Sequence, residues 1–213
     1  GRLLIRLGDL PGARAVLDSL ITGGVAPGSA DVMHQAVFLR GEIDFFAGDF
    51  DKAQDVFVGL TNDPTADVAN DALEYGFLLT EYSAKQPKGL REYANGMLLL
   101  RQMKWEAAVA GFGKAISVSG GSGLADRAQF EQGRAYERAG NGEQAVRVWM
   151  DLVDRHPQGL FSDRALLGAA DVTERLLNDR ARALTLYLRL MTDYDTSPLV
   201  EEARQAALRI RAD

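Results

Sequence analysis

Apolar residues recur along most of the chain at steps of three and four, and they divide it into pairs of short amphipathic segments. Residues at these steps share one face of a helix and form a stripe that can be buried. Within a pair, a short turn separates the two segments. Gly in such a turn suits the left-handed end of a helix, and a following Asp or Asn can cap the next helix. The pattern predicts an all-α chain of helix–turn–helix units, with turns at Gly8-Asp9-Leu10, Gly48-Asp49-Phe50, Met103-Lys104-Trp105 and Gly140-Asn141-Gly142.

The same unit occurs five times. A small residue is followed by an Ala, 12 positions later in four copies and 15 later in the last, and a large apolar residue stands four positions after the Ala. Small residues let two antiparallel helices cross closely. The large residue fills the space against the neighbouring unit. The copies are Gly1, Ala13 and Leu17; Gly41, Ala53 and Phe57; Gly96, Ala108 and Phe112; Gly133, Ala145 and Trp149; and Gly168, Ala183 and Tyr187.

These spacings resemble the tetratricopeptide repeat, a helix–turn–helix unit of about 34 residues. The best copy runs from Gly133 to Pro157 and includes Tyr136 at the expected offset. The resemblance implies an α-solenoid of about five TPR-like repeats, in which the first helices of the repeats line a concave groove.

Two segments extend this plain array. The spacing from Gly41 to Gly96 is 55 residues, and the excess holds an extra helix around 65–84, with apolar residues at helical steps. Whether this helix fills the groove is left open. At the other end, residues 198–211 predict a C-terminal capping helix with one apolar stripe, because a polar outer face keeps a solenoid end soluble.

The repeat register bears on the domain organisation. Gly1 already occupies the eighth position of a repeat, so the array begins within a first helix. Half a helical hairpin cannot bury its apolar face. We therefore expect residues 1–213 to form a single TPR-like superhelical domain that is the C-terminal part of a longer protein.

Composition excludes several classes of chemistry. The chain has no Cys, which rules out disulfides and thiolate metal sites, and its net charge of −6 argues against nucleic-acid binding. No apolar run is long enough for a transmembrane segment. His34 and His156 lie in different repeats without nearby metal partners, which favours structural or surface roles. For the acidic cluster Asp44, Asp49, Asp51 and Asp55, we expect helix caps and solvated helix surface rather than a calcium site. We therefore expect no catalytic residues, cofactor or metal.

The resemblance also implies which residues contact a partner. Positions 2, 5, 9, 12 and 13 of the first helices usually face the ligand in this family. The groove positions are mostly apolar in two repeats and rich in Arg in the next. Such a surface would suit a peptide with an apolar stretch and an acidic end, since Arg and aromatic residues anchor interfaces. Two alternatives stay open. In one, Phe38, Phe45, Leu90 and Leu100 belong to the core between repeats, and in the other the arginines Arg127, Arg134 and Arg138 pair with Glu131 and Glu137 on their own helix. The predicted partner-binding groove is Phe38, Glu42, Phe46, Tyr93, Met97, Arg101, Arg127, Arg134 and Arg138.

The segment from Gly159 to Arg211 resembles bacterial cell-envelope TPR proteins, of the Tol–Pal-associated coordinator and barrel-assembly lipoprotein types. The similar sequence segments are Leu160–Leu166, Leu177–Leu184 and Asp193–Pro198, and in the last of these Asp195 stands where Pro is usual. This resemblance favours a periplasmic or outer-membrane-associated protein, with the cytoplasm as the alternative. The sequence thus favours a non-enzymatic protein–protein interaction scaffold. Two further hypotheses are a structural subunit of a larger complex and an accessory region of an envelope enzyme whose catalytic part lies upstream.

Overall fold

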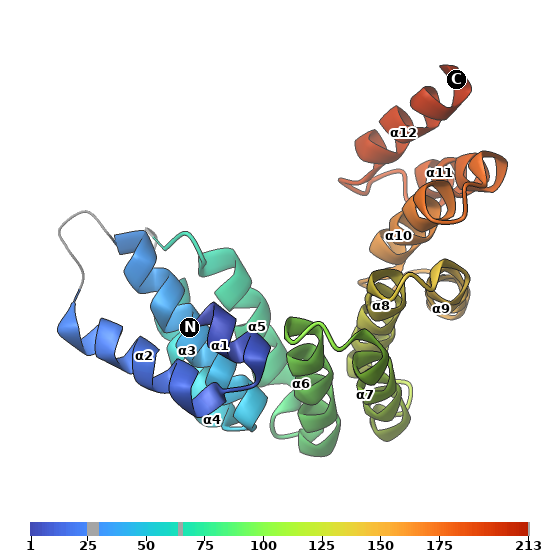
Figure 1. The fold of residues 1–213 in the computed structure, drawn as a ribbon. Coiled ribbons are helices and arrows are strands. Elements are labelled where there is room, and N and C mark those ends of the chain that lie inside the picture. The colour runs from blue at the N-terminus through green and yellow to red at the C-terminus, as the bar shows by residue number, and fades with distance from the viewer. Residues whose placement is uncertain (25–29, 64–65, 213) are drawn as a thin grey trace. The chain divides into compact units, whose positions relative to one another are not determined.

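The computed structural model describes residues 1–24, 30–63 and 66–212, and the regular elements in these ranges are all α-helices. This confirms the predicted all-α class. The chain packs as two compact units, Gly1–Lys104 and Trp105–Asp213, which we describe separately (Figure 1). The single domain over 1–213 stays a prediction. The helices are α1 (Arg2–Leu7), α2 (Leu10–Gly23), α3 (Ala30–Ala47), α4 (Phe50–Thr61), α5 (Ala69–Tyr82), α6 (Pro87–Arg101), α7 (Trp105–Ser119), α8 (Gly123–Arg138), α9 (Gly142–Arg155), α10 (Ser162–Arg175), α11 (Arg180–Asp193) and α12 (Val200–Ala212).

All five repeats turn in the same way. One residue in the turn after each first helix has a positive φ, between 54° and 87°. Gly accepts this left-handed conformation without a steric penalty, whereas a side chain makes it costly. Three of the five are Gly, as the sequence pattern predicted, and the other two are Met and Asn. They are Gly8, Gly48, Met103, Gly140 and Asn178.

In the first unit the helices α1 to α5 pack in chain order, and α6 packs on α3. The pattern residues Ala13, Leu17, Ala53 and Phe57 are all buried, as their spacing predicted. The extra helix is confirmed as α5, which packs on α4, and we call it the inserted helix. Its expected start at 65 lies outside the described residues.

In the second unit the helices α7 to α12 also pack in chain order, and α8 contacts α10. Trp149 is buried at the centre of this unit. It lies so close to Gly133 that a Cβ atom there would stand 2.2 Å from the indole nitrogen. The same nitrogen donates a hydrogen bond of 3.0 Å to the Phe130 carbonyl. The repeat pattern therefore encodes a direct Gly–Trp contact, which explains why the first helix needs a small residue at this point.

The C-terminal helix α12 buries Ala203, Ala206 and Ala207, as predicted for a capping helix. The hairpin expected for the third copy is divided, because α6 closes the first unit and α7 opens the second. The packing of this third hairpin stays a prediction. None of the described helices is long and apolar enough to cross a membrane.

Candidate functional site

The structure corrects part of the predicted groove in the first unit. Phe38, Glu42 and Tyr93 are buried, so their side chains are not on the surface that a partner would meet. The alternative that places Phe38, Phe45 and Leu90 in the core is confirmed, and Tyr93 is buried as well. Of the other groove residues in this unit, Phe46 and Met97 are partly buried and Arg101 is exposed.

The burial of Glu42 follows from its two partners. The Tyr75 hydroxyl of the inserted helix donates a hydrogen bond of 2.9 Å to Glu42 Oε1, and the Arg101 guanidinium pairs with the same oxygen. Burial, followed by the Glu42 charge, raises the pKa of Tyr75 well above its usual value. Burial acts to lower the pKa of Arg101, but the Glu42 charge raises it above its usual value. A carboxylate held by two such donors is stable inside the protein.

Tyr75 also answers the question that the sequence left open about the extra helix. Its ring stacks on Phe57 with centroids 4.6 Å apart, and it meets Phe38 and Phe45 edge to face. The inserted helix thus covers the face of α3 that carries Phe38 and Glu42. Beside them lies a cavity of about 290 Å³, whose lining includes Arg2, Gln35, Phe38, Glu42, Asp71 and Arg101.

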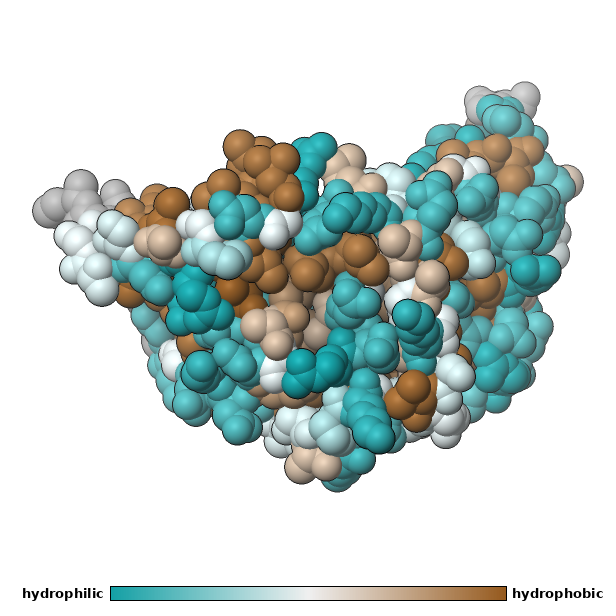
Figure 2. Space-filling view, turned by 60° about the horizontal axis from the view of Figure 1, so that its bottom comes forward, coloured by the Kyte–Doolittle hydropathy of each residue, from teal (hydrophilic) through white to brown (hydrophobic). Residues whose placement is uncertain are grey.

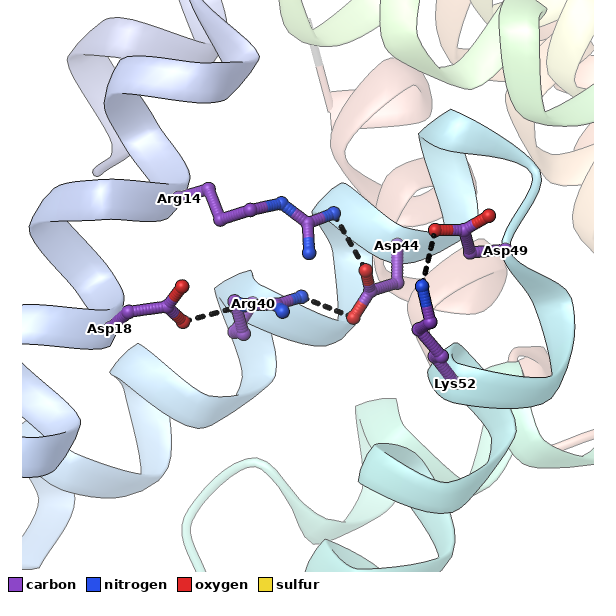
Figure 3. A network of polar contacts seen from close by, with 6 residues as sticks. All are labelled: Arg14, Asp18, Arg40, Asp44, Asp49 and Lys52. Atoms are coloured by element: carbon purple, nitrogen blue, oxygen red, sulfur yellow. Dashed lines mark hydrogen bonds and ion pairs between the residues drawn. The ribbon is translucent and has the colours of Figure 1, made fainter.

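A second buried carboxylate lies nearby in the same unit (Figure 3). Asp44 is buried, and its two oxygens meet Arg14, at 2.6 Å, and Arg40. The prediction that Asp44 belongs to a solvated helix surface is therefore wrong, because arginines from α2 and α3 converge on it. Asp49, in contrast, occupies the N-cap position of α4, where its side chain makes no capping hydrogen bond and instead pairs with the exposed Lys52 at 3.1 Å. The Asp44 network joins α2 to α3.

The second unit places the predicted arginines of α8 in three different settings. Arg127 lies over the Phe161 ring, 5.0 Å from its centroid. Arg134 pairs with Glu131 on its own helix at 3.2 Å, which confirms that alternative for this residue. Arg138 is exposed and has no hydrogen bond or ion pair within the described ranges. The two arginines that a partner could reach most readily are therefore Arg134 and Arg138.

The fold adds two arginines that the sequence analysis missed. Arg175 of α10 pairs with Glu137 of α8 at 2.6 Å, and Arg209 of α12 pairs with Glu174 of α10 at 2.9 Å. These pairs link α8, α10 and α12 along one side of the unit. We call Arg134, Arg138, Arg175 and Arg209 the arginine row. No sequence signal adds Arg175 and Arg209 to the group, because their partners are 38 and 35 positions away.

In the arginine row the cations lie outside and the carboxylates inside. Arg134, Arg175 and Arg209 are 47%, 58% and 60% exposed in their side chains. Their partners Glu131, Glu137 and Glu174 are only 9%, 26% and 16% exposed. Glu174 also accepts a hydrogen bond from Tyr187 of α11. The solvent therefore meets guanidinium groups on this side.

The opposite polarity is found where α9 meets α11. Arg182 pairs with Glu143 and Arg189 pairs with Asp154, but here Glu143 is 67% exposed and Asp154 is 61% exposed. A cavity of about 560 Å³ lies beside these carboxylates and also reaches Asp151. In these pairs the exposed carboxylates belong to α9 and the arginines to α11, whereas the more exposed partners in the pairs of α8, α10 and α12 are arginines.

Apolar side chains also reach the surface. On the face drawn in Figure 2, hydrophobic side chains gather in patches between hydrophilic ones. Among the described residues, the inserted helix exposes Leu73 and Phe77, one helical turn apart, and Phe77 is 74% exposed. Residues four positions apart share a helix face, so these two form one apolar stripe.

Comparison with known proteins agrees with the helical repeats. Residues 127–159, which hold most of α8 and all of α9, match the family model of the tetratricopeptide repeat. A search of curated proteins found no match. The matched segment contains the Gly133–Trp149 contact and two members of the arginine row. The comparison thus identifies one tetratricopeptide repeat, over residues 127–159, within an all-α architecture of helical hairpins.

Proposed function

We propose that this protein is a non-enzymatic protein-interaction scaffold whose second unit binds an acidic segment of a partner protein through the arginine row. TPR repeats generally mediate protein–protein interaction, and one repeat of this chain matches the family. The observation that carries the proposal is the polarity of the ion pairs on α8, α10 and α12, which point guanidinium groups outward.

The chemistry of arginine suits this role. A guanidinium group binds carboxylates through two parallel hydrogen bonds, and Arg is enriched among the residues that anchor interfaces. Each inner carboxylate leaves some N–H groups of its arginine unused, because a guanidinium carries five donors. A partner carboxylate can therefore bind from outside without breaking the inner pair. Since the whole chain has a net charge of −6, the attraction is local to this side of the unit.

The proposal keeps the predicted Arg134 and Arg138 and adds Arg175 and Arg209. Arg127 is a flanking contact, because its guanidinium already lies over Phe161. In the first unit, Phe46, Met97 and Arg101 stay candidate contacts for a separate part of the partner.

The cell envelope is the proposed location. Support comes from the resemblance of the segment 159–211 to envelope TPR proteins, including Leu160–Leu166 and Asp193–Pro198. Fractionation of the native cells tests this part: we expect the protein with the envelope or periplasmic fraction, and recovery only from the cytoplasm would contradict it.

Site-specific crosslinking tests the binding surface. A photo-crosslinking residue replaces Arg138 on α8, and in a matched control it replaces Arg147 on α9. Both arginines are exposed, and neither has an ion pair among the described residues. After illumination of native cells, we expect the variant at 138 to capture a protein with an acidic segment and the variant at 147 not to do so. Equal capture at both positions, or capture at 147 alone, would contradict the proposal.

A structural subunit of a permanent complex is the second candidate, and the exposed Leu73 and Phe77 favour it. Obligate interfaces are large and apolar, and this stripe provides a starting point for one. Light scattering of the purified chain tests it. Self-association that Phe77→Ser abolishes would favour this candidate, whereas a well-behaved monomer would favour the scaffold.

A further inference from the structure

We propose that Asp31, His34 and Asp67 of the first unit form a binding site for a divalent transition-metal ion of the zinc type. One ligand atom from each of these residues lies within 4.8 Å of the other two. Asp31 and His34 stand three positions apart in the first turns of α3, and Asp67 belongs to the turn that precedes the inserted helix. The fold thus joins residues that are more than 30 positions apart in sequence.

The surroundings of His34 point to a ligand. Its Nε2 atom lies 3.2 Å from Asp63 Oδ2, while its Nδ1 atom is buried and has no hydrogen-bond partner in the described part of the chain. A neutral imidazole whose Nε2–H donates a hydrogen bond to Asp63 carries a lone pair on Nδ1. A buried lone pair without a partner costs free energy, and a metal ion at Nδ1 removes this cost.

This arrangement matches the order of groups around metal-bound histidines. One ring nitrogen binds the ion, and the other donates its proton to a carboxylate, which fixes the ring and makes it a better ligand. In this site Asp63 is that carboxylate, and Asp31 and Asp67 are the other two ligands.

The ligand set selects the class of ion. One imidazole and two carboxylates suit zinc and similar first-row ions, whereas calcium and magnesium prefer oxygen ligands alone. In a tetrahedral zinc site, the ligand atoms stand about 3.4 Å apart, given zinc–ligand distances of about 2.1 Å. The exposed side chains of Asp31 and Asp67 can rotate to close the remaining distance. Three protein ligands leave a fourth position for water.

The site would connect two parts of the first unit. Asp67 already accepts a hydrogen bond of 3.0 Å from Gln35 of α3, one residue after His34. A bound ion would add a stronger link between α3 and the turn that leads into the inserted helix. Gln35 also lines the cavity beside Glu42, so the ion would stabilise one wall of that cavity.

Calorimetric titration of the purified chain with Zn²⁺ tests the proposal. We expect one ion per chain for the wild type, at least tenfold weaker binding for Asp67→Asn, and a loss of binding for His34→Gln. Asp63→Asn should weaken binding tenfold or more, because it removes the carboxylate that orients His34. Circular dichroism checks that each variant is folded, and Asp67 is exposed, so its substitution is tolerated most easily.

His156 provides the matched control, because it is the other histidine of the chain and lies in the second unit, 3.6 Å from Asp126. His156→Gln should bind Zn²⁺ as the wild type does, and Zn²⁺ should raise the Tm of the wild type and of this control by more than that of Asp67→Asn. Absence of binding to the wild type would overturn the proposal. It would also be overturned by equal affinity in the wild type, His34→Gln and Asp67→Asn, or by a loss of binding in His156→Gln alone.

Discussion

The Tyr75 hydroxyl donates a hydrogen bond of 2.9 Å to Glu42, a carboxylate that is only 1% exposed. Through this contact the inserted helix is part of the core of the first unit. Tyr75→Phe keeps the ring but leaves Glu42 with one donor fewer. Because hydrogen bonds to charged groups contribute about 1.5–3 kcal/mol, we expect the free energy of unfolding to fall by about 2 kcal/mol.

Urea denaturation of the two proteins measures this loss. Tyr136→Phe in the second unit is the control, since the Tyr136 hydroxyl makes no hydrogen bond in the described ranges. It should change the stability little. A Tyr75→Phe variant as stable as the wild type would show that the contact with Glu42 does not hold the inserted helix.

The buried Asp44 makes a second prediction. Asp44→Asn removes the charge that Arg14 and Arg40 share, and breaking a buried ion pair typically costs 3–5 kcal/mol. Since both arginines keep some exposure, we expect a loss of about 3 kcal/mol. Asp49→Asn breaks only an exposed pair with Lys52 and should cost less than about 1 kcal/mol. Thermal unfolding distinguishes the two, and equal effects would contradict the structure.

Met103 should be replaceable by glycine with a gain in stability. Its φ of 59° is left-handed, which costs a side chain about 1–2 kcal/mol. Glycine avoids this cost but loses more chain entropy on folding, about 0.5–1 kcal/mol. We therefore expect Met103→Gly to raise the free energy of unfolding by up to about 1 kcal/mol. Gly140→Ala should lower it, because it places a side chain at a φ of 78°. A loss of stability in Met103→Gly, or a gain in Gly140→Ala, measured by urea denaturation, would show that these turns are not strained as described.

Asp171 predicts a dependence of stability on pH. The pKa of Asp171 is raised above the ordinary 3.8. Burial is the largest cause of this shift, and the hydrogen bond from Tyr187 acts in the opposite direction. The folded state therefore binds the Asp171 proton more tightly than the unfolded state. Its contribution to stability is full below pH 3.8 and is lost as the pH rises through the folded pKa. Asp171→Asn has no carboxyl group at this position, so its stability does not fall in this way as the pH rises.

Urea denaturation between pH 3 and pH 7 measures the effect, since the stability of Asp171→Asn relative to the wild type should increase across this range. Asp151 provides the opposite case, because its hydrogen bond with Arg155 lowers its pKa. Its contribution is present above pH 3.8 and is lost as the pH falls through the lowered folded pKa. Asp151→Asn should thus be less stable than the wild type near neutral pH, and this difference in stability should shrink at acid pH. A constant difference over pH for both variants would contradict these assignments.

The repeat pattern predicted the helices and turns because both depend on local spacing. A glycine such as Gly133 and a tryptophan 16 positions later reveal where two helices cross, since the contact lies within one hairpin. The turn at Met103 was also predicted, because the apolar segments on either side keep the repeat spacing, but its left-handed φ was not, since the residue is not glycine.

The charged contacts could not be found in this way. Glu42 was expected to face a partner, but Tyr75 and Arg101, which are 33 and 59 residues away, cover it. Arg175 and Arg209 likewise join the arginine row only through packing between repeats. A helical period shows which face of a helix is apolar, but it does not show which charges on a neighbouring repeat will meet it. For the same reason His34 gave no metal signal in the sequence.

Charge reversal tests most directly whether the exposed arginines of α8, α10 and α12 bind an acidic partner. Arg138→Glu breaks no ion pair among the described residues, and Arg147→Glu on α9 is the matched control. Binding of the crosslinked partner should weaken at least tenfold in Arg138→Glu, remain unchanged in Arg147→Glu, and weaken with added salt in the wild type, since exposed charges are screened. Unchanged affinity in a folded Arg138→Glu protein, or an equal loss in both variants, would contradict the account.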